Sequence, residues 1–169
     1  MRALARAPLA AVSFLTRVPV GRAIAFDAAD VGRAAPLFPL VGAAVGGTVA
    51  LAGSLAAREL PPLLAAALAL AAGALLTGAL HLDALADVAD GLGGRTREDA
   101  LRIMREHTVG AYGAVALVSS LLVKTVAVGA LLSIDGGAWA LVAAGGLSDR
   151  KSTRLNSSHL RLSRMPSSA

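Results

Sequence analysis

The chain has 169 residues, which is enough for a single domain. It is 56% hydrophobic but only 3% aromatic, with a mean hydropathy of +0.67, and it has no cysteine, which excludes disulfides and thiolate metal sites. The net charge of +5 arises from residues 150–169, which hold five basic residues and no acid. Residues 1–149 are neutral, so the charge does not predict nucleic-acid binding. The abundant Ala, Leu, Val and Gly are typical of helices that pack closely in lipid.

The first 20 residues predict a short helix at the membrane surface. Arg2 and Arg6 precede a short apolar run, as they would in a signal peptide. However, Arg17 and Pro19 interrupt this run early, and no small-residue cleavage site follows closely. An interfacial or short re-entrant helix accounts better for this pattern.

Three apolar segments have the length of about 20 residues that a membrane-spanning helix needs. Residues 34–57 and 60–80 are uncharged, and residues 111–134 contain only one charge, Lys124. A mid-span charge is costly in lipid, so we expect Lys124 to face the inside of the bundle. A fourth apolar run, residues 138–147, is too short to span. We therefore predict an all-α fold: a polytopic integral membrane helical bundle, truncated after the start of a fourth span.

The basic residues between these segments predict the orientation of the bundle. Residues 1–33 and 81–110 hold five and four basic residues, whereas the turns at 58–59 and 135–137 hold one and none. Cytoplasmic segments are enriched in Lys and Arg. We therefore expect a multi-pass protein of the cell (inner or cytoplasmic) membrane, with its N-terminus and residues 81–110 in the cytoplasm.

Residues 81–91, with the sequence HLDALADVADG, carry the candidate chemistry. Asp83, Asp87 and Asp90 are spaced i, i+4 and i+7, which places them on one face if the second span continues as a helix. Like charges at the end of a span repel each other and are costly to desolvate. Mg²⁺ suits such oxygen ligands and typically takes one or two carboxylates together with substrate phosphates. We predict that these aspartates bind Mg²⁺; the alternative is a solvated acidic helix end.

Basic residues near this motif are candidates for substrate contacts. By helical spacing, His81 is expected to point away from the acidic face. Three roles are open to it: a base, a phosphate contact or a residue that only lies at the interface. Arginine suits phosphate because its guanidinium binds two oxygens, although the orientation rule alone also explains arginines here. Glu98 and Arg102 are expected to form an i, i+4 pair. The candidate substrate-binding residues are Arg95, Arg97, Arg102, Arg105 and Lys124.

Residues 149–169 differ in character from the rest of the chain. Six of the last 20 residues are Ser, and the Ala- and Leu-rich texture is lost. One interpretation is a disordered basic tail. We favour a translated adapter or vector sequence, because the change falls inside an apolar run. We expect the natural protein to continue differently after residue 148.

Together, five segments resemble the cobalamin synthase family, the adenosylcobinamide-GDP ribazoletransferases. The most specific is H-L-D-x-L-A-D-x-x-D-G at residues 81–91, and supporting segments follow the family's order at residues 14–20, 38–42, 97–105 and 109–113. By this resemblance, residues 1–148 form the N-terminal part of a membrane transferase domain. The family's further membrane helices and its late Gly-Asp-rich motif are missing, so we do not expect this polypeptide to be active alone.

The resemblance implies the last step in assembly of the cobalamin nucleotide loop. The adenosylcobinamide phosphate group of adenosylcobinamide-GDP would pass to α-ribazole, or its 5′-phosphate, with release of GMP. Asp83 and Asp87 would hold Mg²⁺, Asp90 would bind the metal or activate the attacking hydroxyl, and His81 would support them. The arginines would hold the GMP leaving group. The partners would be the two substrates and the lipid bilayer, and an oligomer is compatible with the sequence.

Three other classes of membrane protein share parts of this pattern. Residues 87–95 come close to the opening motif of CDP-alcohol phosphotransferases, but Gly94 and Met104 depart from it and its later paired aspartates are absent. A polyprenyl transferase needs an aromatic-rich pocket that this composition does not offer. A cation-coupled transporter component would carry its acids near the middle of a span, whereas these lie at the end of one.

Overall fold

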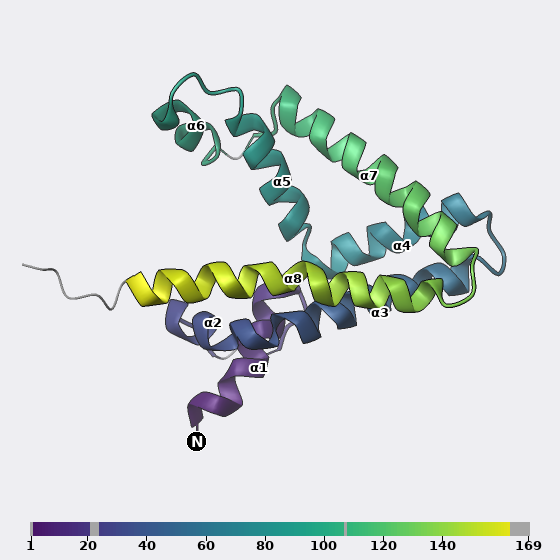
Figure 1. The fold of residues 1–169 in the computed structure, drawn as a ribbon, viewed down its shortest axis with the longest axis horizontal. Coiled ribbons are helices and arrows are strands. Elements are labelled where there is room, and N and C mark those ends of the chain that lie inside the picture. Colours follow the sequence, from purple (N-terminus) through teal and green to yellow (C-terminus); the bar gives the residue numbers. More distant parts are fainter. Residues whose placement is uncertain (1, 21–23, 107, 163–169) are drawn as a thin grey trace, which may run out of the picture.

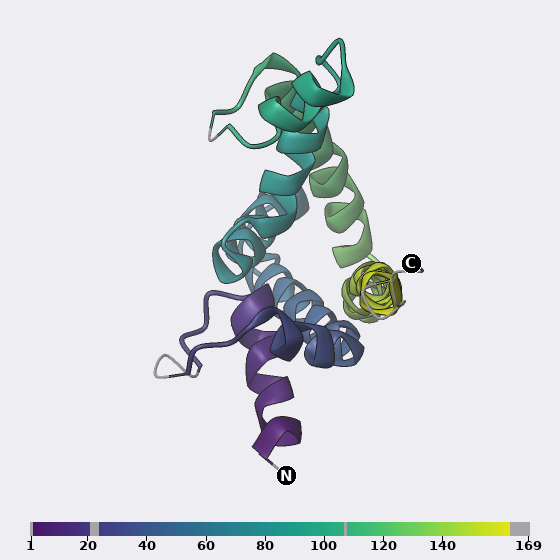
Figure 2. The same cartoon turned by 90° about the vertical axis from the view of Figure 1, so that its left-hand side faces the viewer.

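The computed structural model describes residues 2–20, 24–106 and 108–162, with side chains described for residues 6–20, 24–106 and 108–149. All regular structure in this part of the chain is helical, which confirms the predicted all-α fold. Figures 1 and 2 show long helices that pack against one another, with short helices at the periphery. In chain order the elements are α1 (Arg2–Leu15), α2 (Ala28–Ala34), η1 (Ala35–Leu37), α3 (Phe38–Ala56), α4 (Pro62–Thr77), α5 (Leu80–Gly91), α6 (Arg97–Ile103), α7 (Ala111–Leu132) and α8 (Gly137–Leu162).

Two continuous helical segments of the described chain are long and apolar enough to cross a membrane. They are Ala28–Ala56, which runs through α2, η1 and α3, and Ala111–Leu132, which is α7. α4 and α5 pass the same test only together, and they are bent by 90° where they meet. The fold is thus that of an all-α membrane protein, with α8 beginning where the fourth apolar run was expected.

The bend between α4 and α5 lies at Gly78 and Ala79, which have left-handed backbone conformations with φ of 65° and 59°. Glycine adopts this region freely, whereas an L-residue such as alanine does so at a cost of about 1–2 kcal/mol. Arg17 supports the bend, since its backbone N–H donates to the Leu76 carbonyl at 2.7 Å and its side chain packs over Gly78. The acidic motif was expected on a continuation of the second span. It lies instead on a separate helix, α5.

α3 and α8 run antiparallel and form the most extensive helix pair (Figure 1). Their backbones approach closely because glycines lie at the contact. A methyl group at Gly42 would collide with the Gly145 carbonyl oxygen, and one at Gly46 with the Leu141 carbonyl oxygen. Small residues at helix contacts are typical of membrane bundles, where close approach increases van der Waals contact. The Ala- and Gly-rich composition predicted this kind of packing.

Four long helices share a small core. Ala50 of α3, Ala66 of α4, Val128 of α7 and Leu141 of α8 are all buried in it. Many other apolar side chains of α4 and α7 are exposed, among them Leu68, Leu75, Val115, Leu122 and Val126. Exposed apolar surface of this kind is expected of helices that face lipid or further helices.

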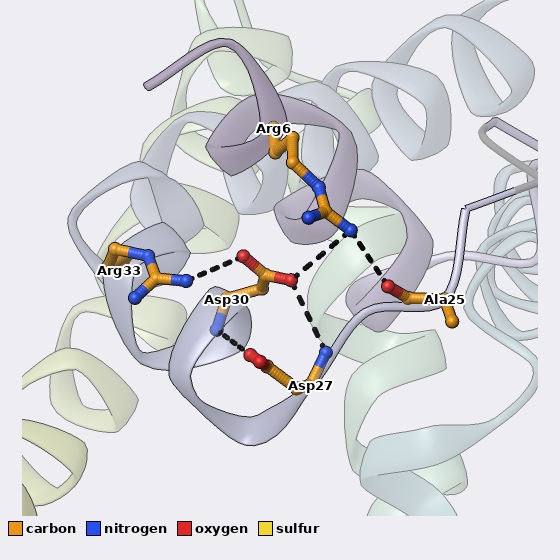
Figure 3. Close-up of polar contacts among 5 residues, drawn as sticks. All are labelled: Arg6, Ala25, Asp27, Asp30 and Arg33. Carbon is orange, nitrogen blue, oxygen red and sulfur yellow. Dashed lines mark hydrogen bonds and ion pairs between the residues drawn. The ribbon is translucent and has the colours of Figure 1, made fainter. Parts of the chain in front are cut away.

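α1 and α2 form a second packed unit with the start of α3. The ring of Phe38 is buried there and stacks on Phe14, with ring centroids 5.6 Å apart. Figure 3 shows the polar contacts beside this unit, where the buried Asp30 carboxylate lies 2.7 Å from Arg33 and 3.6 Å from Arg6. These contacts hold α1 against α2. The interfacial position expected of α1 remains a prediction.

The two tight turns of the bundle lie at one end. Gly53 of α3 packs against Leu132 of α7, and Gly129 of α7 packs against Pro62 and Leu63 of α4. In Figure 1 the α3–α4 and α7–α8 turns are both on the right, while α5 and α6 lie at the upper left. The predicted alternation of basic and non-basic connections requires such an arrangement. Which end faces the cytoplasm remains a prediction.

Candidate active site

α5 carries the acidic motif, and the candidate site is built on this helix. Asp83, in its first turn, is exposed, and Asp87, one turn later, is half-buried. Within the described part of the chain, neither carboxylate has a hydrogen-bond or ion-pair partner. Their i, i+4 spacing places them on the same side of α5. Both are therefore available to a ligand.

Asp90 has a different environment. Its side chain is buried, with 8% of the residue exposed. The backbone N–H groups of Gly110 and Gly113 donate to its two carboxylate oxygens, at 2.7 and 2.8 Å. Gly110 is the N-cap residue of α7 and offers no side-chain cap, so the α5 carboxylate satisfies N–H groups that the first turn of a helix leaves unpaired.

The three aspartates therefore do not form one cluster. Among the described residues, no group of three or more His, Asp or Glu side chains is arranged to hold a metal ion. Helical spacing considers α5 alone, whereas the uncapped start of α7 holds the Asp90 carboxylate. The roles expected of Asp90, at a metal with Asp83 and Asp87 or in activating the hydroxyl, remain predictions. Metal binding by Asp83 and Asp87 remains a prediction.

His81 and Lys124 line a cavity of about 230 Å³ between α3, α4, α5, α7 and α8. His81 Nε2 lies 3.2 Å from a carboxylate oxygen of Asp149. The cavity lining includes neither Asp83 nor Asp87, so His81 does lie off the acidic face, as its spacing predicted. Lys124 is exposed although it lines this cavity, so its expected position facing the inside of the bundle remains a prediction. Because Asp149 is the first residue of the segment that we consider foreign, we assign its ion pair no role in a reaction.

The four candidate arginines follow α5, in the loop before α6, in α6 and just after it. Thr96 caps α6 by accepting a hydrogen bond from the Asp99 N–H at 3.1 Å. Arg102 bonds to Glu106 at 2.7 Å and lies 3.8 Å from Asp99, so its expected pairing with Glu98 is wrong. The other three arginines are exposed and have no ion-pair partner among the described residues; they are Arg95, Arg97 and Arg105.

Close contacts bring α6 back to the end of α5. A methyl group at Gly91 would lie 2.7 Å from the Met104 side chain, and one at Gly94 would lie 2.6 Å from the Ala100 backbone nitrogen. The glycines after Asp90 thus serve the packing of α6, which is the ordinary structural explanation of such residues. This packing places the arginine-bearing segment next to the C-terminal end of the acidic helix, as Figure 1 shows.

The sequence analysis missed Gly110 and Gly113 as partners of Asp90. A signal for them was present, because two glycines three residues apart, the N-cap and third residues, begin an apolar helix that has no capping side chain of its own. The partner of such a helix start is not encoded nearby, since the hydrogen bonds join residues 20 and 23 positions apart.

Comparison with known proteins decides the family. Residues 7–155 match the family model described as cobalamin-5-phosphate synthase. The chain belongs to the cobalamin-5-phosphate synthase family. This membership confirms the resemblance predicted from the sequence motifs, and no solved structure gives a significant match.

Curated relatives of this cobalamin-5-phosphate synthase family member have names that agree with its family membership. The chain is 48% identical over 126 residues to an adenosylcobinamide-GDP ribazoletransferase from Ralstonia nicotianae, covering 73% of this chain and 49% of that protein. It is 47% identical over 147 residues to a protein of that name from Azorhizobium caulinodans, covering 82% of this chain and 55% of that protein. The chain thus spans about half the length of the curated relatives that it matches.

The cobalamin-5-phosphate synthase match also bears on the C-terminal segment. It ends at residue 155, a few residues beyond the boundary predicted at 148. α8 continues across that boundary without a break, to Leu162. The foreign origin of residues 149–169 remains a prediction.

Proposed function

We propose that this chain is part of a membrane enzyme that transfers the adenosylcobinamide phosphate group from adenosylcobinamide-GDP to α-ribazole, or to its 5′-phosphate, and releases GMP. Family membership and the names of the relatives support the reaction. The structural observation that carries the proposal is the pair of carboxylates, Asp83 and Asp87, which lie on one side of α5 and have no partner among the residues that the structure describes. Two like charges in such a place favour a cationic partner.

The reaction is a phosphorus-group transfer. A ribose hydroxyl forms a new oxygen–phosphorus bond at the phosphorus attached to cobinamide. The bond from that phosphorus to the bridging oxygen breaks, and this oxygen leaves with GMP. The hydroxyl proton passes to a base or to water. Transfers of this kind are catalysed mainly by positioning the reactants and by neutralising charge on the phosphate oxygens.

The donor set on α5 fits Mg²⁺. Asp83 and Asp87 offer hard, acceptor-only oxygens without a partner among the described residues. Mg²⁺ usually takes one or two carboxylates and completes its shell with water and substrate phosphates, so the lack of a third carboxylate is compatible with it. When bound, the ion would supply positive charge to the diphosphate oxygens.

The chain's own cations add to this charge. Arg95, Arg97 and Arg105 have no acidic partner among the described residues, so their guanidinium groups are available to the GMP phosphate. Arg102 is already engaged by Glu106 and Asp99 and contributes less.

The substrates bind on the open side of α5. The cavity near His81 and Lys124, at about 230 Å³, is smaller than the roughly 300–1,000 Å³ of ordinary ligand pockets. We therefore do not place the nucleotide there. In a cell we place this side of α5 at the cytoplasmic face of the inner membrane, because residues 81–110 hold four arginines, whereas the turns at 58–59 and 135–137 hold one and none.

The test uses a chimera, because the chain spans about half of its relatives. Residues 7–148 replace the matched segment of the Ralstonia nicotianae relative, and release of GMP from adenosylcobinamide-GDP is measured with α-ribazole and Mg²⁺. Asp83→Asn and Asp87→Asn should each lower turnover about 100-fold or more, the usual effect of removing an electrostatic contact to a reacting phosphate.

The matched control is Asp135→Asn. Asp135 is an exposed aspartate in the α7–α8 turn, at the opposite end of the bundle, and its replacement should leave turnover unchanged. Chelation of Mg²⁺ should abolish GMP release in every variant. Near-normal turnover in Asp83→Asn or Asp87→Asn would reject the proposed site.

A further inference from the structure

We infer that Asp90 is a positioning residue, which ties the acidic helix α5 to the start of α7 and so sets the direction in which Asp83 and Asp87 face. Its effect on turnover rests on the proposed function. Its structural role does not, because it follows from contacts between α5 and α7 alone.

The first observation is that the α7 backbone engages both oxygens of one carboxylate. Asp90 accepts from Gly110 at 2.7 Å and from Gly113 at 2.8 Å, and it is buried. These two N–H groups belong to the N-cap and third residues of α7, whose partial positive charge favours an anion. A buried carboxylate with charge-assisted bonds to backbone N–H groups is satisfied as it stands.

The second observation is that the two glycines leave the room that Asp90 occupies. A methyl group at Gly113 would collide with the Asp90 carboxylate, and one at Gly110 would come within 2.5 Å of it. The methyl group at Gly113 would also lie 3.0 Å from the Ala86 carbonyl oxygen. Neither glycine has a positive φ, so close approach of α5, and not backbone conformation, is the reason for glycine here.

The third observation concerns the remaining contacts of α5 in the described part of the chain. Its first turn meets α8 through His81 and Asp149, at 3.2 Å. At its start it is joined to α4 through the left-handed residues Gly78 and Ala79, at a 90° bend. Its packing is mainly against α7 and α6, through the buried Ala86, Asp90 and Gly91. Figure 1 shows α5 reaching the start of α7 with its C-terminal end.

A distinct consequence follows for the site. Asp83 and Asp87 lie on one helix, so their separation from each other does not depend on Asp90. By contrast, the orientation of that helix relative to α7 and to the arginine-bearing segment depends on Asp90. Loss of Asp90 should therefore lower the rate of transfer without changing the Mg²⁺ concentration that the enzyme needs.

The structural role of Asp90 at the start of α7 is tested on this chain by amide hydrogen exchange in detergent micelles. Asp90→Asn and Gly113→Ala should each speed exchange at the start of α7, residues 110–114, by about fivefold to tenfold, as expected for a lost helix cap. Exchange in α3 and α8 should not change. Asp83→Asn is the matched control and should leave residues 110–114 as they are. Unchanged exchange at those residues in Asp90→Asn would overturn the inference.

The effect of Asp90 on turnover is tested in the chimera, in an experiment that distinguishes a positioning residue from a metal ligand. Asp90→Asn and Gly113→Ala should lower kcat to a similar degree, with the half-saturating Mg²⁺ concentration unchanged, whereas Asp87→Asn should raise that concentration. If Asp90→Asn does not fold, Gly113→Ala alone decides the matter, because it displaces the carboxylate and keeps its charge. A raised Mg²⁺ requirement in Gly113→Ala or Asp90→Asn would identify Asp90 as a ligand and overturn the inference. An inactive wild-type chimera would count against the proposed function only, since the exchange result stands without activity.

Discussion

At the scale of single residues, two aspartates on one helix differ in burial and in hydrogen bonding because different residues surround them. Asp87 is half-buried with no partner among the described residues, while Asp90, less than one turn later, is enclosed by the start of α7. The spacing of the aspartates could be read from the sequence, because helical periodicity is local. The partner of Asp90 could not, because it depends on where a later helix begins in space.

Arg97 and Arg102 of α6 provide a residue-scale prediction. Arg102 is engaged by two acids, whereas Arg97 has no acidic partner among the described residues. In the chimera, Arg97→Gln should raise the KM for adenosylcobinamide-GDP about tenfold, the effect of losing one charge-assisted contact. Arg102→Gln should raise it by less than about threefold, because a paired surface arginine contributes little more. Steady-state GMP release measures both KM values. An increase in KM for Arg102→Gln that equals or exceeds the increase for Arg97→Gln would contradict this assignment of the arginines.

At the scale of elements, the bend between α4 and α5 separates the acidic helix from the membrane span. Gly78 is a recognisable helix stop, since glycine is common in the left-handed position after a helix. Nothing in the sequence marks Ala79, which adopts the same conformation without being glycine. The helix boundaries were therefore within reach of sequence analysis. The 90° change of direction was not, because it depends on two successive left-handed residues and on the packing of Arg17.

The bend predicts opposite effects for one substitution at two nearby sites. Ala79→Gly removes the strain of a left-handed alanine and should stabilise the protein by about 0.5–1 kcal/mol. Ala84→Gly, at an exposed position inside α5, should destabilise it by about 1 kcal/mol through helix propensity. Thermal unfolding in detergent measures both. If Ala79→Gly destabilises as much as Ala84→Gly, the left-handed conformation at residue 79 is wrong.

The contact between α3 and α8 allows a further element-scale prediction. Gly46 faces the Leu141 carbonyl oxygen with no room for a methyl group, whereas Gly47, its neighbour, has only a distant contact with the Val142 side chain. Gly46→Ala should destabilise the protein by about 1–3 kcal/mol, because it pushes the helices apart. Gly47→Ala should be neutral or slightly stabilising, because alanine is the better helix former. Equal unfolding temperatures for the two variants would contradict the close α3–α8 contact.

At the scale of the whole molecule, hydropathy predicted which segments form long apolar helices, and the distribution of basic residues predicted a membrane orientation that remains a prediction. Both are sums over many residues and do not depend on tertiary contacts. The pairing of α3 with α8 through glycines was beyond the sequence, because small residues occur along all the apolar segments. The same holds for the position of α5, which turns away from α4 by 90° and packs against the start of α7.

Single-cysteine labelling tests the orientation of the molecule, because the chain has no cysteine of its own. The cysteine of Arg58→Cys or Asp135→Cys, in the two turns at one end, should react with an impermeant maleimide from outside intact cells. The cysteine of Glu98→Cys, in α6, should react only after permeabilisation. Labelling of position 98 in intact cells would place the acidic helix on the wrong side for cytoplasmic substrates.

The most direct test of the account is the binding of Mn²⁺, a spectroscopically visible substitute for Mg²⁺, to the chimera in the presence of adenosylcobinamide-GDP. Electron paramagnetic resonance should detect a bound ion in the wild-type chimera and in Asp90→Asn. It should detect none above background in Asp83→Asn or Asp87→Asn. A bound ion that survives the loss of Asp83 or Asp87, or one that disappears only in Asp90→Asn, would contradict the division of roles on α5.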